Sequence, residues 1–252
     1  MQYDILEKPD FSLVRAVFHQ AGESLLVESA AMVAKDSALE MRTQMQGGLL
    51  GAAKRKLLGG ETVFQNTFTA TAPGQQLWFA PGPEGDLEVV EMDGTTPIFL
   101  SSGAFLASAP TVQLDTKWGG AKGFFSGTGM FLLVAQGTGP LFFCAYGGVH
   151  AVDVGPAGYI CDTSHIVGFT GGLQYTVNKV GGMKSLFFSG EGLVCTFHGQ
   201  GRLWISTRNE MDTAMRRGDL AKVSELQYGK LPQLEAQLAS AQETEQKGFK
   251  LL

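Results

Sequence analysis

The fold is decided by the stretch Lys122-Gly-Phe-Phe-Ser-Gly-Thr-Gly-Met-Phe-Leu-Leu-Val-Ala-Gln-Gly-Thr-Gly-Pro-Leu-Phe-Phe-Cys144. Within it, a Gly-Thr-Gly-Pro turn separates two short apolar runs, Met130–Val134 and Leu141–Cys144. A similar stretch recurs at residues 184–205, and a fainter one lies at residues 54–79. Short apolar runs bounded by glycine-rich turns are typical of β-strands. We therefore expect a β protein in which one glycine-punctuated module occurs three times.

Separate landmarks support this triplication. Comparable segments start at Gly22, Gly85 and Gly148, at equal intervals of 63 residues. They predict three antiparallel β units at about residues 22–84, 85–147 and 148–207, inside one β domain that spans residues 1–208 and forms a sandwich or prism. A second landmark, a small residue, two larger apolar residues and another small one, recurs in sequence order as Ala31-Met-Val-Ala34, Ala104-Phe-Leu-Ala107 and Gly158-Tyr-Ile-Cys161.

Composition agrees with a packed β domain. The chain has 252 residues, of which 44% are hydrophobic and 10% aromatic, and 34 are glycine. A Gly excess without a Gly-X-Y period indicates many tight turns rather than collagen. The formal net charge of −5 argues against broad binding to nucleic acid or anionic lipid, and we expect no nucleic-acid partner. Two short segments, Arg202-Leu-Trp204 and Lys179–Lys184, are the modest basic and aromatic candidates for RNA contact.

We expect neither a transmembrane segment nor a signal peptide in this sequence. The long run without Lys, Arg, Asp or Glu at residues 123–152 is broken by glycines and Pro140 into pieces too short for a spanning helix. The first residues lack the basic and apolar regions of a signal peptide. Cys144, Cys161 and Cys195 each lie in an apolar run and are expected to be buried thiols in a reducing compartment. These features predict a cytoplasmic protein.

The composition changes after Arg208. Residues 209–252 are rich in Ala, Glu, Gln, Lys and Leu, with Asp212 as a plausible N-cap and with Gly218 and Pro232 as breaks. We expect one or two helices that pack on the β body or a partner subunit. The alternative is a tail that recruits another protein.

No catalytic or metal motif is evident. The four histidines are not spaced as metal ligands on one strand or helix, so we expect no metal and no cofactor. Asp162-Thr-Ser164-His165 contains the residue types of a catalytic triad, but neighbours on an extended chain cannot converge in that way, and a turn explains them better. An enzyme would need a cleft where Asp153, Asp162 and His165 meet. We predict that the protein is not an enzyme.

Three lysines hold equivalent places in the three units: Lys54, Lys122 and Lys184. In a body with pseudo-threefold symmetry they would form a ring that could contact an anion or a partner surface. The alternative, which we favour, is that each keeps an exposed strand edge from aggregating.

A resemblance lies in the run from Gly47-Gly48 to Leu57-Leu-Gly-Gly-Glu-Thr-Val-Phe-Gln-Asn-Thr-Phe-Thr-Ala70 and in the later Gly-Thr-Gly and Gly-Glu-Gly-Leu turns. Over about residues 1–208 the chain resembles the bacterial branch of the mitochondrial-biogenesis (altered inheritance of mitochondria) family. Eukaryotic members are linked to inner-membrane organisation, and bacterial members are of unknown function. The resemblance implies a fold like that of the tryptophan RNA-binding attenuation protein, a β-sandwich that assembles into rings. It supplies no catalytic residues, and RNA binding is not carried over because fold does not transmit function.

The leading hypothesis is a non-enzymatic, soluble β scaffold or interaction protein that forms a homo-oligomer through its remaining apolar edges. The alternative is a module that binds a small molecule or lipid in a pocket between the β units.

Overall fold

The structure is a computed structural model that describes residues 1–45, 64–101, 103–115, 132–179 and 193–225. In these residues all paired strands run antiparallel and form four sheets. Two short helices follow the last strand, α3 (Glu210–Arg217) and α4 (Leu220–Ser224). The predicted all-β fold with a C-terminal helical tail is therefore confirmed.

The strands of each sheet are hydrogen-bonded side by side in a fixed spatial order. The first sheet is β1 (Gln2–Leu6), β2 (Leu13–Val17), β7 (Gln76–Phe79) and β4 (Met32–Lys35). The second is β5 (Glu40–Met45), β6 (Phe64–Thr69), β3 (Ser24–Glu28), β10 (Phe105–Ser108), β13 (Thr138–Cys144) and β8 (Leu87–Asp93). The third is β11 (Gln113–Asp115), β12 (Leu132–Gln136), β9 (Ile98–Ser101), β16 (Ile166–Thr170), β19 (Gly201–Ser206) and β14 (Val149–Val154). The fourth is β15 (Tyr159–Asp162), β18 (Leu193–Gly199) and β17 (Leu173–Lys179).

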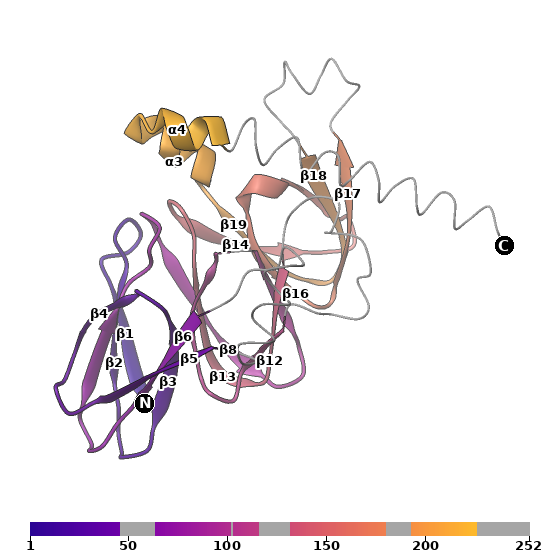
Figure 1. Cartoon of the computed structure of the whole chain (residues 1–252). Coiled ribbons are helices and arrows are strands. Elements are labelled where there is room, and N and C mark those ends of the chain that lie inside the picture. Colours follow the sequence, from indigo (N-terminus) through magenta and orange to yellow (C-terminus); the bar gives the residue numbers. More distant parts are fainter. Residues whose placement is uncertain (46–63, 102, 116–131, 180–192, 226–252) are drawn as a thin grey trace.

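The strand pairings follow one scheme in three successive sets of six strands, β2–β7, β8–β13 and β14–β19. In each set the sixth strand lies between the first and the third, and the fifth lies between the second and the fourth. Figure 1 shows the sets in order across the molecule, from β2–β4 at the left to β17 and β18 at the right.

Neighbouring sets are joined by one strand pairing each. The second strand of set one, β3, pairs with the third strand of set two, β10. The second strand of set two, β9, pairs with the third strand of set three, β16. Each six-stranded sheet therefore contains half of one set and half of the next.

The core consists of three clusters of buried apolar side chains. In β3 the burial alternates, with Leu25 and Val27 buried and their neighbours half-buried, because successive side chains point to opposite faces. All four residues of β10 are buried, because this strand is covered on both faces: Leu106 belongs to one core cluster and Phe105 to another. Leu106 of set two belongs to the cluster formed mainly by set one, and Val167 of set three belongs to the cluster formed mainly by set two.

The two strands predicted before Cys144 are present as β12 and β13, but the predicted turn at residues 137–140 is wrong, because residues 138–140 belong to β13 and only Gly137 separates the strands. Residues 122–131 lie outside the described residues. The two strands belong to different sheets: β12 pairs with β9 and β11, and β13 pairs with β8 and β10. The chain changes sheet at Gly137, whose φ is +134°. A Cβ there would lie 2.1 Å from the Thr111 carbonyl oxygen, so only glycine fits without a shift of the backbone.

The landmarks of the predicted triplication fall on strands with different roles. Ala31–Ala34 and Ala104–Ala107 correspond, since they overlap β4 and β10, the third strands of their sets. Gly158–Cys161 leads into β15, a second strand, and the third strand of that set is β16. The first set also begins at Leu13, before the predicted start at Gly22. That the chain is one module in three copies around a pseudo-axis stays a prediction.

The described part of the tail packs on the β body. Arg217 of α3 forms an ion pair with Glu84, which precedes β8, and Ala214 is buried. Gly218, with a φ of +68°, separates the two helices, as its place in the sequence predicted. Asp212 is not an N-cap, because α3 begins at Glu210.

Candidate functional site

Sequence reasoning singled out three lysines as a candidate ring. Lys54, Lys122 and Lys184 all lie outside the described residues. Whether they converge on an anion or a partner therefore stays a prediction.

The candidate triad residues make structural contacts and do not form a triad with one another. The Asp162 side chain accepts hydrogen bonds from the Ser164 backbone N–H at 2.7 Å and from the Ser164 hydroxyl at 2.6 Å, and it caps the 3₁₀ turn η1 (Thr163–His165). His165 Nδ1 lies 2.8 Å from the Ser206 carbonyl oxygen, and its Nε2 lies 3.2 Å from the Asn209 amide. The carboxylate thus shapes a turn, and the imidazole ties this turn to the end of β19.

Asp153 makes a different contact. It lies on β14 opposite Arg202 of β19, whose Nε donates a hydrogen bond to it at 2.8 Å. This bond and the charge of the guanidinium lower the pKa of the Asp153 carboxyl.

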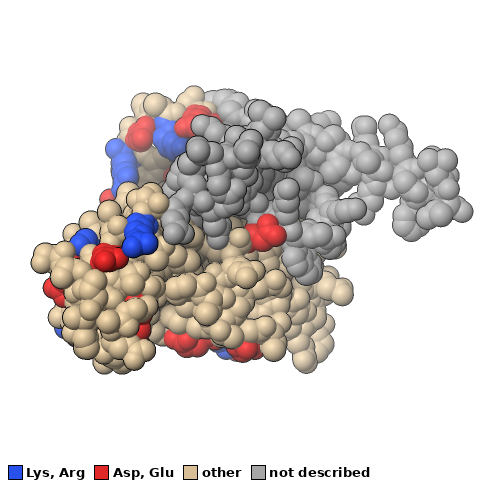
Figure 2. Space-filling view, turned by 60° about the horizontal axis from the view of Figure 1, so that its bottom comes forward, with Lys and Arg blue, Asp and Glu red and all other residues tan. Residues whose placement is uncertain are grey.

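The segment Arg202-Leu-Trp204 does not offer an aromatic surface to RNA. Arg202 is paired with Asp153, and Leu203 and Trp204 are buried. The Trp204 ring packs edge-on against Phe143, with centroids 5.2 Å apart. On the face in Figure 2, the charged groups of the described residues lie in small clusters separated by uncharged surface. Of the segment Lys179–Lys184, only the backbone of Lys179 is described.

The three cysteines are free thiols, and two of the three are buried as predicted. Cys144 and Cys195 are buried and Cys161 is half-buried. Burial raises the pKa of each to about 12, so the thiols stay protonated at neutral pH. Within the described residues, no three His, Cys, Asp or Glu side chains are grouped to hold a metal ion. In the same part of the chain, every helix is too short or too polar to cross a bilayer.

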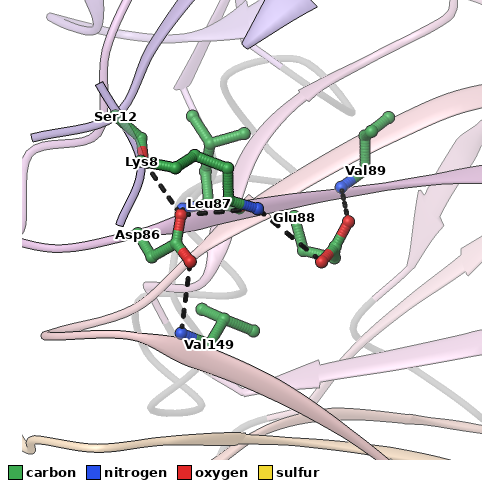
Figure 3. A network of polar contacts seen from close by, with 7 residues as sticks. All are labelled: Lys8, Ser12, Asp86, Leu87, Glu88, Val89 and Val149. Atoms are coloured by element: carbon green, nitrogen blue, oxygen red, sulfur yellow. Dashed lines mark hydrogen bonds and ion pairs between the residues drawn. The ribbon is translucent and has the colours of Figure 1, made fainter. Parts of the chain in front are cut away.

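A buried carboxylate, Asp86, joins parts of the chain that are far apart in sequence (Figure 3). Its Oδ1 accepts hydrogen bonds from the Ser12 hydroxyl at 2.9 Å and from the Leu87 N–H at 2.8 Å. Lys8 Nζ lies 3.5 Å from the same oxygen, and the Val149 N–H lies 3.5 Å from Oδ2. The side chain is only 3% exposed. We interpret Asp86 as a structural link between the N-terminal loop and the first strands of sets two and three.

The surface feature that sequence reasoning missed lies at two sheet edges. Strand β4 ends the first sheet and β15 ends the fourth. Four of the exposed large apolar side chains lie on these two strands: Met32 and Val33 on β4, and Tyr159 and Ile160 on β15. An open edge with apolar side chains is a template for pairing with another strand. In the sequence, both strands carry the recurring pattern of a small residue, two larger apolar residues and another small one, but this pattern does not show which of its copies are exposed.

Comparisons with known proteins agree with this architecture. A family model described as Mitochondrial biogenesis AIM24 matches residues 3–208. An uncharacterised protein of Streptococcus pyogenes serotype M6 is 26% identical over 217 residues, which cover 83% of this chain and 86% of that protein. The crystal structure of another Streptococcus pyogenes protein matches with a TM-score of 0.68 and 25% identity, and covers 88% of this chain and 98% of that one. The expected likeness to the tryptophan RNA-binding attenuation protein stays a prediction.

Proposed function

This chain belongs to the Mitochondrial biogenesis AIM24 family, and we propose that it is a non-enzymatic β scaffold that associates with further copies of itself. The observation that carries the proposal is the pair of open sheet edges with exposed apolar side chains, β4 and β15. Large apolar side chains at a strand edge without a partner among the described strands are costly to leave in water and favour pairing with another chain.

The contacts of the polar candidates support a non-enzymatic role. Catalytic acids and bases usually need a shared cleft and perturbed pKa values. Here Asp153 pairs with Arg202 across two strands, Asp162 caps a turn, and His165 contacts a backbone carbonyl. Each of these groups has a structural partner.

The tail supports a further contact. Met215 of α3 and Leu220 of α4 are exposed, although the helices are tied to the β body through Arg217. We propose that residues 209–252 add a surface for a partner protein. The expected cytoplasmic location also stays a prediction.

Native mass spectrometry of the purified full-length chain tests the scaffold proposal. A homo-oligomer whose mass is a whole multiple of the chain mass supports it. A monomer at micromolar concentration contradicts it. A chain that carries an adduct of constant mass would instead favour the alternative, a pocket that binds a small molecule or lipid.

A further inference from the structure

We propose that β15 of one copy pairs in antiparallel fashion with β4 of the next copy, with Ile160 opposite Lys35. The inference rests on the proposed self-association and names the surface that carries it. The same kind of strand pairing occurs twice within the chain, where β10 pairs with β3 and where β16 pairs with β9.

Both internal pairings use the same strands of their sets. At the first, Ala107 of β10 lies opposite Val27 of β3. At the second, Gly168 of β16 lies opposite Leu100 of β9. In each case the second strand of one set pairs with the third strand of the following set. Among the described strands, β7 is the only partner of β4, the third strand of set one, and β18 is the only partner of β15, the second strand of set three, so the other edge of each strand is open.

The third strands share a bulge, and in β10 and β16 the side chain at the bulge packs into the core cluster of the preceding set. In all three, the register against the sixth strand shifts by one residue, at Val33 in β4, Leu106 in β10 and Val167 in β16. Leu106 and Val167 are 0% and 2% exposed, whereas Val33 is 59% exposed. The residue before the bulge behaves in the same way, since Phe105 and Ile166 are buried but Met32 is exposed. Strand β4 thus presents side chains of the type that the internal pairings bury.

The second strands differ in side-chain exposure in the same way as the third strands. Phe99 of β9 is 5% exposed and stacks on Phe169 of β16, with ring centroids 5.0 Å apart. Ile160 of β15 is 64% exposed. A copy of β4 placed against β15 would cover this side chain as β16 covers β9.

The register of the proposed pairing follows from the equal spacing between the second and third strands in the three sets. Val27 precedes Met32 by five residues, Leu100 precedes Phe105 by five, and Cys161 precedes Ile166 by five. Cys161 therefore holds the place of Val27 and Leu100. By the internal pairings, Cys161 faces Ala34 of the next copy.

The next residue pair in this register is the one named in the proposal, Lys35 and Ile160. Ser108 faces Leu26, and Phe169 faces Phe99. The same register places Lys35 of one copy opposite Ile160 of the other. The Phe169–Phe99 pair shows that this position has room for two large side chains.

The geometry makes the contact head-to-tail. In Figure 1, β4 lies at the left and β18, the partner of β15, at the right, so a chain cannot close on itself without rearrangement. The three-stranded sheet of one copy would join the four-stranded sheet of another. A contact between two different surfaces forms a ring where the rotation closes and a filament where it does not.

Disulfide trapping in the full-length chain tests the pairing. The variant Lys35→Cys/Ile160→Cys places one thiol at each open edge, in the predicted register. Mild oxidation is expected to give covalent dimers and higher multimers on a non-reducing gel. The matched control is Arg42→Cys/Ile160→Cys, because Arg42 is an exposed residue on β5 in a different sheet. Neither this control nor the single variants should form the ladder.

The outcomes separate the two proposals. A ladder specific to Lys35→Cys/Ile160→Cys supports both. A native oligomer that gives no more cross-linking in this variant than in the control overturns the pairing of β15 with β4 and leaves the scaffold proposal standing on another surface. A monomeric wild-type chain without cross-links overturns both.

Discussion

Val33 and Leu106 are the bulge residues of corresponding strands, β4 and β10, yet Val33 is exposed and Leu106 is fully buried. The two strands pair in the same way with the sixth strands of their sets. They differ in what lies on the other side, because β10 has β3 as a neighbour and β4 ends its sheet. The exposure of Val33 therefore reflects the lack of a second neighbour among the described strands and not a different local fold.

This relationship predicts unequal costs of truncation. Leu106→Ala should lower the free energy of unfolding by about 2–5 kcal/mol, because it leaves a cavity in the core. Val33→Ala should change it by less than about 0.5 kcal/mol in dilute protein, as expected of a surface site. Urea unfolding below the concentration of assembly measures both. Equal losses would contradict the assignment of Val33 to an open edge.

Asp86→Ala should lower the free energy of unfolding by about 2–4 kcal/mol. The substitution leaves the Ser12 hydroxyl and the Leu87 N–H without their acceptor and Lys8 without its buried partner. Glu88→Ala is the matched control, because Glu88 is the more exposed partner of the same lysine, and it should cost less than about 1 kcal/mol. Chemical denaturation compares the two, and a neutral Asp86→Ala would remove Asp86 as a structural link.

Gly137→Ala should be much more destabilising than Gly74→Ala. Both glycines have positive φ, but a Cβ at Gly137 would meet the Thr111 carbonyl oxygen, whereas nothing lies within 4 Å at Gly74. We expect a loss of more than about 2 kcal/mol for Gly137→Ala and about 1 kcal/mol for Gly74→Ala. Thermal melting gives the comparison, and similar melting temperatures would contradict the change of sheet at Gly137.

Stability should fall as the pH rises above about 9. Burial raises the pKa of Cys144 in the folded chain to about 12, so this thiol keeps its proton when the unfolded chain loses it. Its contribution is complete below the unfolded pKa of about 8.5 and is lost as the pH rises to 12, by at most about 1.4 kcal/mol per pH unit. The pKa values of Cys195 and Tyr3 are also raised to about 12 and act in the same direction. Cys144→Ala should flatten the slope between pH 9 and 12, and an unchanged slope would contradict the assignment.

Local patterns were sufficient to predict the strands and the tail. The apolar runs before Cys144 and around Leu203 are strands, and Gly218 ends the first helix of the tail, because burial and backbone freedom at these sites depend on neighbouring residues. Pairing partners depend on distant residues and could not be read locally. The sequence therefore did not show that the two runs on either side of Gly137 belong to different sheets.

The candidate sites show the same limit. Ala31–Ala34 and Ala104–Ala107 have one pattern, and only the presence of a neighbouring strand decides that the first is exposed. Asp86 follows Gly85 at the predicted start of a unit, and no local pattern marks it as buried, because its burial requires Ser12 and Val149 to meet there. Asp162 and His165 share a short segment but have different structural partners, Ser164 for Asp162 and the distant Ser206 and Asn209 for His165.

Complementation between two edge variants tests the central claim, head-to-tail pairing of β15 with β4, most directly. Val33→Glu blocks β4 and keeps β15 intact, whereas Ile160→Glu blocks β15 and keeps β4 intact. Sedimentation velocity should find each variant monomeric alone and an equimolar mixture dimeric, because the mixture has one intact pair of edges. A mixture that stays monomeric while the wild type assembles, or single variants that assemble like the wild type, would contradict the claim.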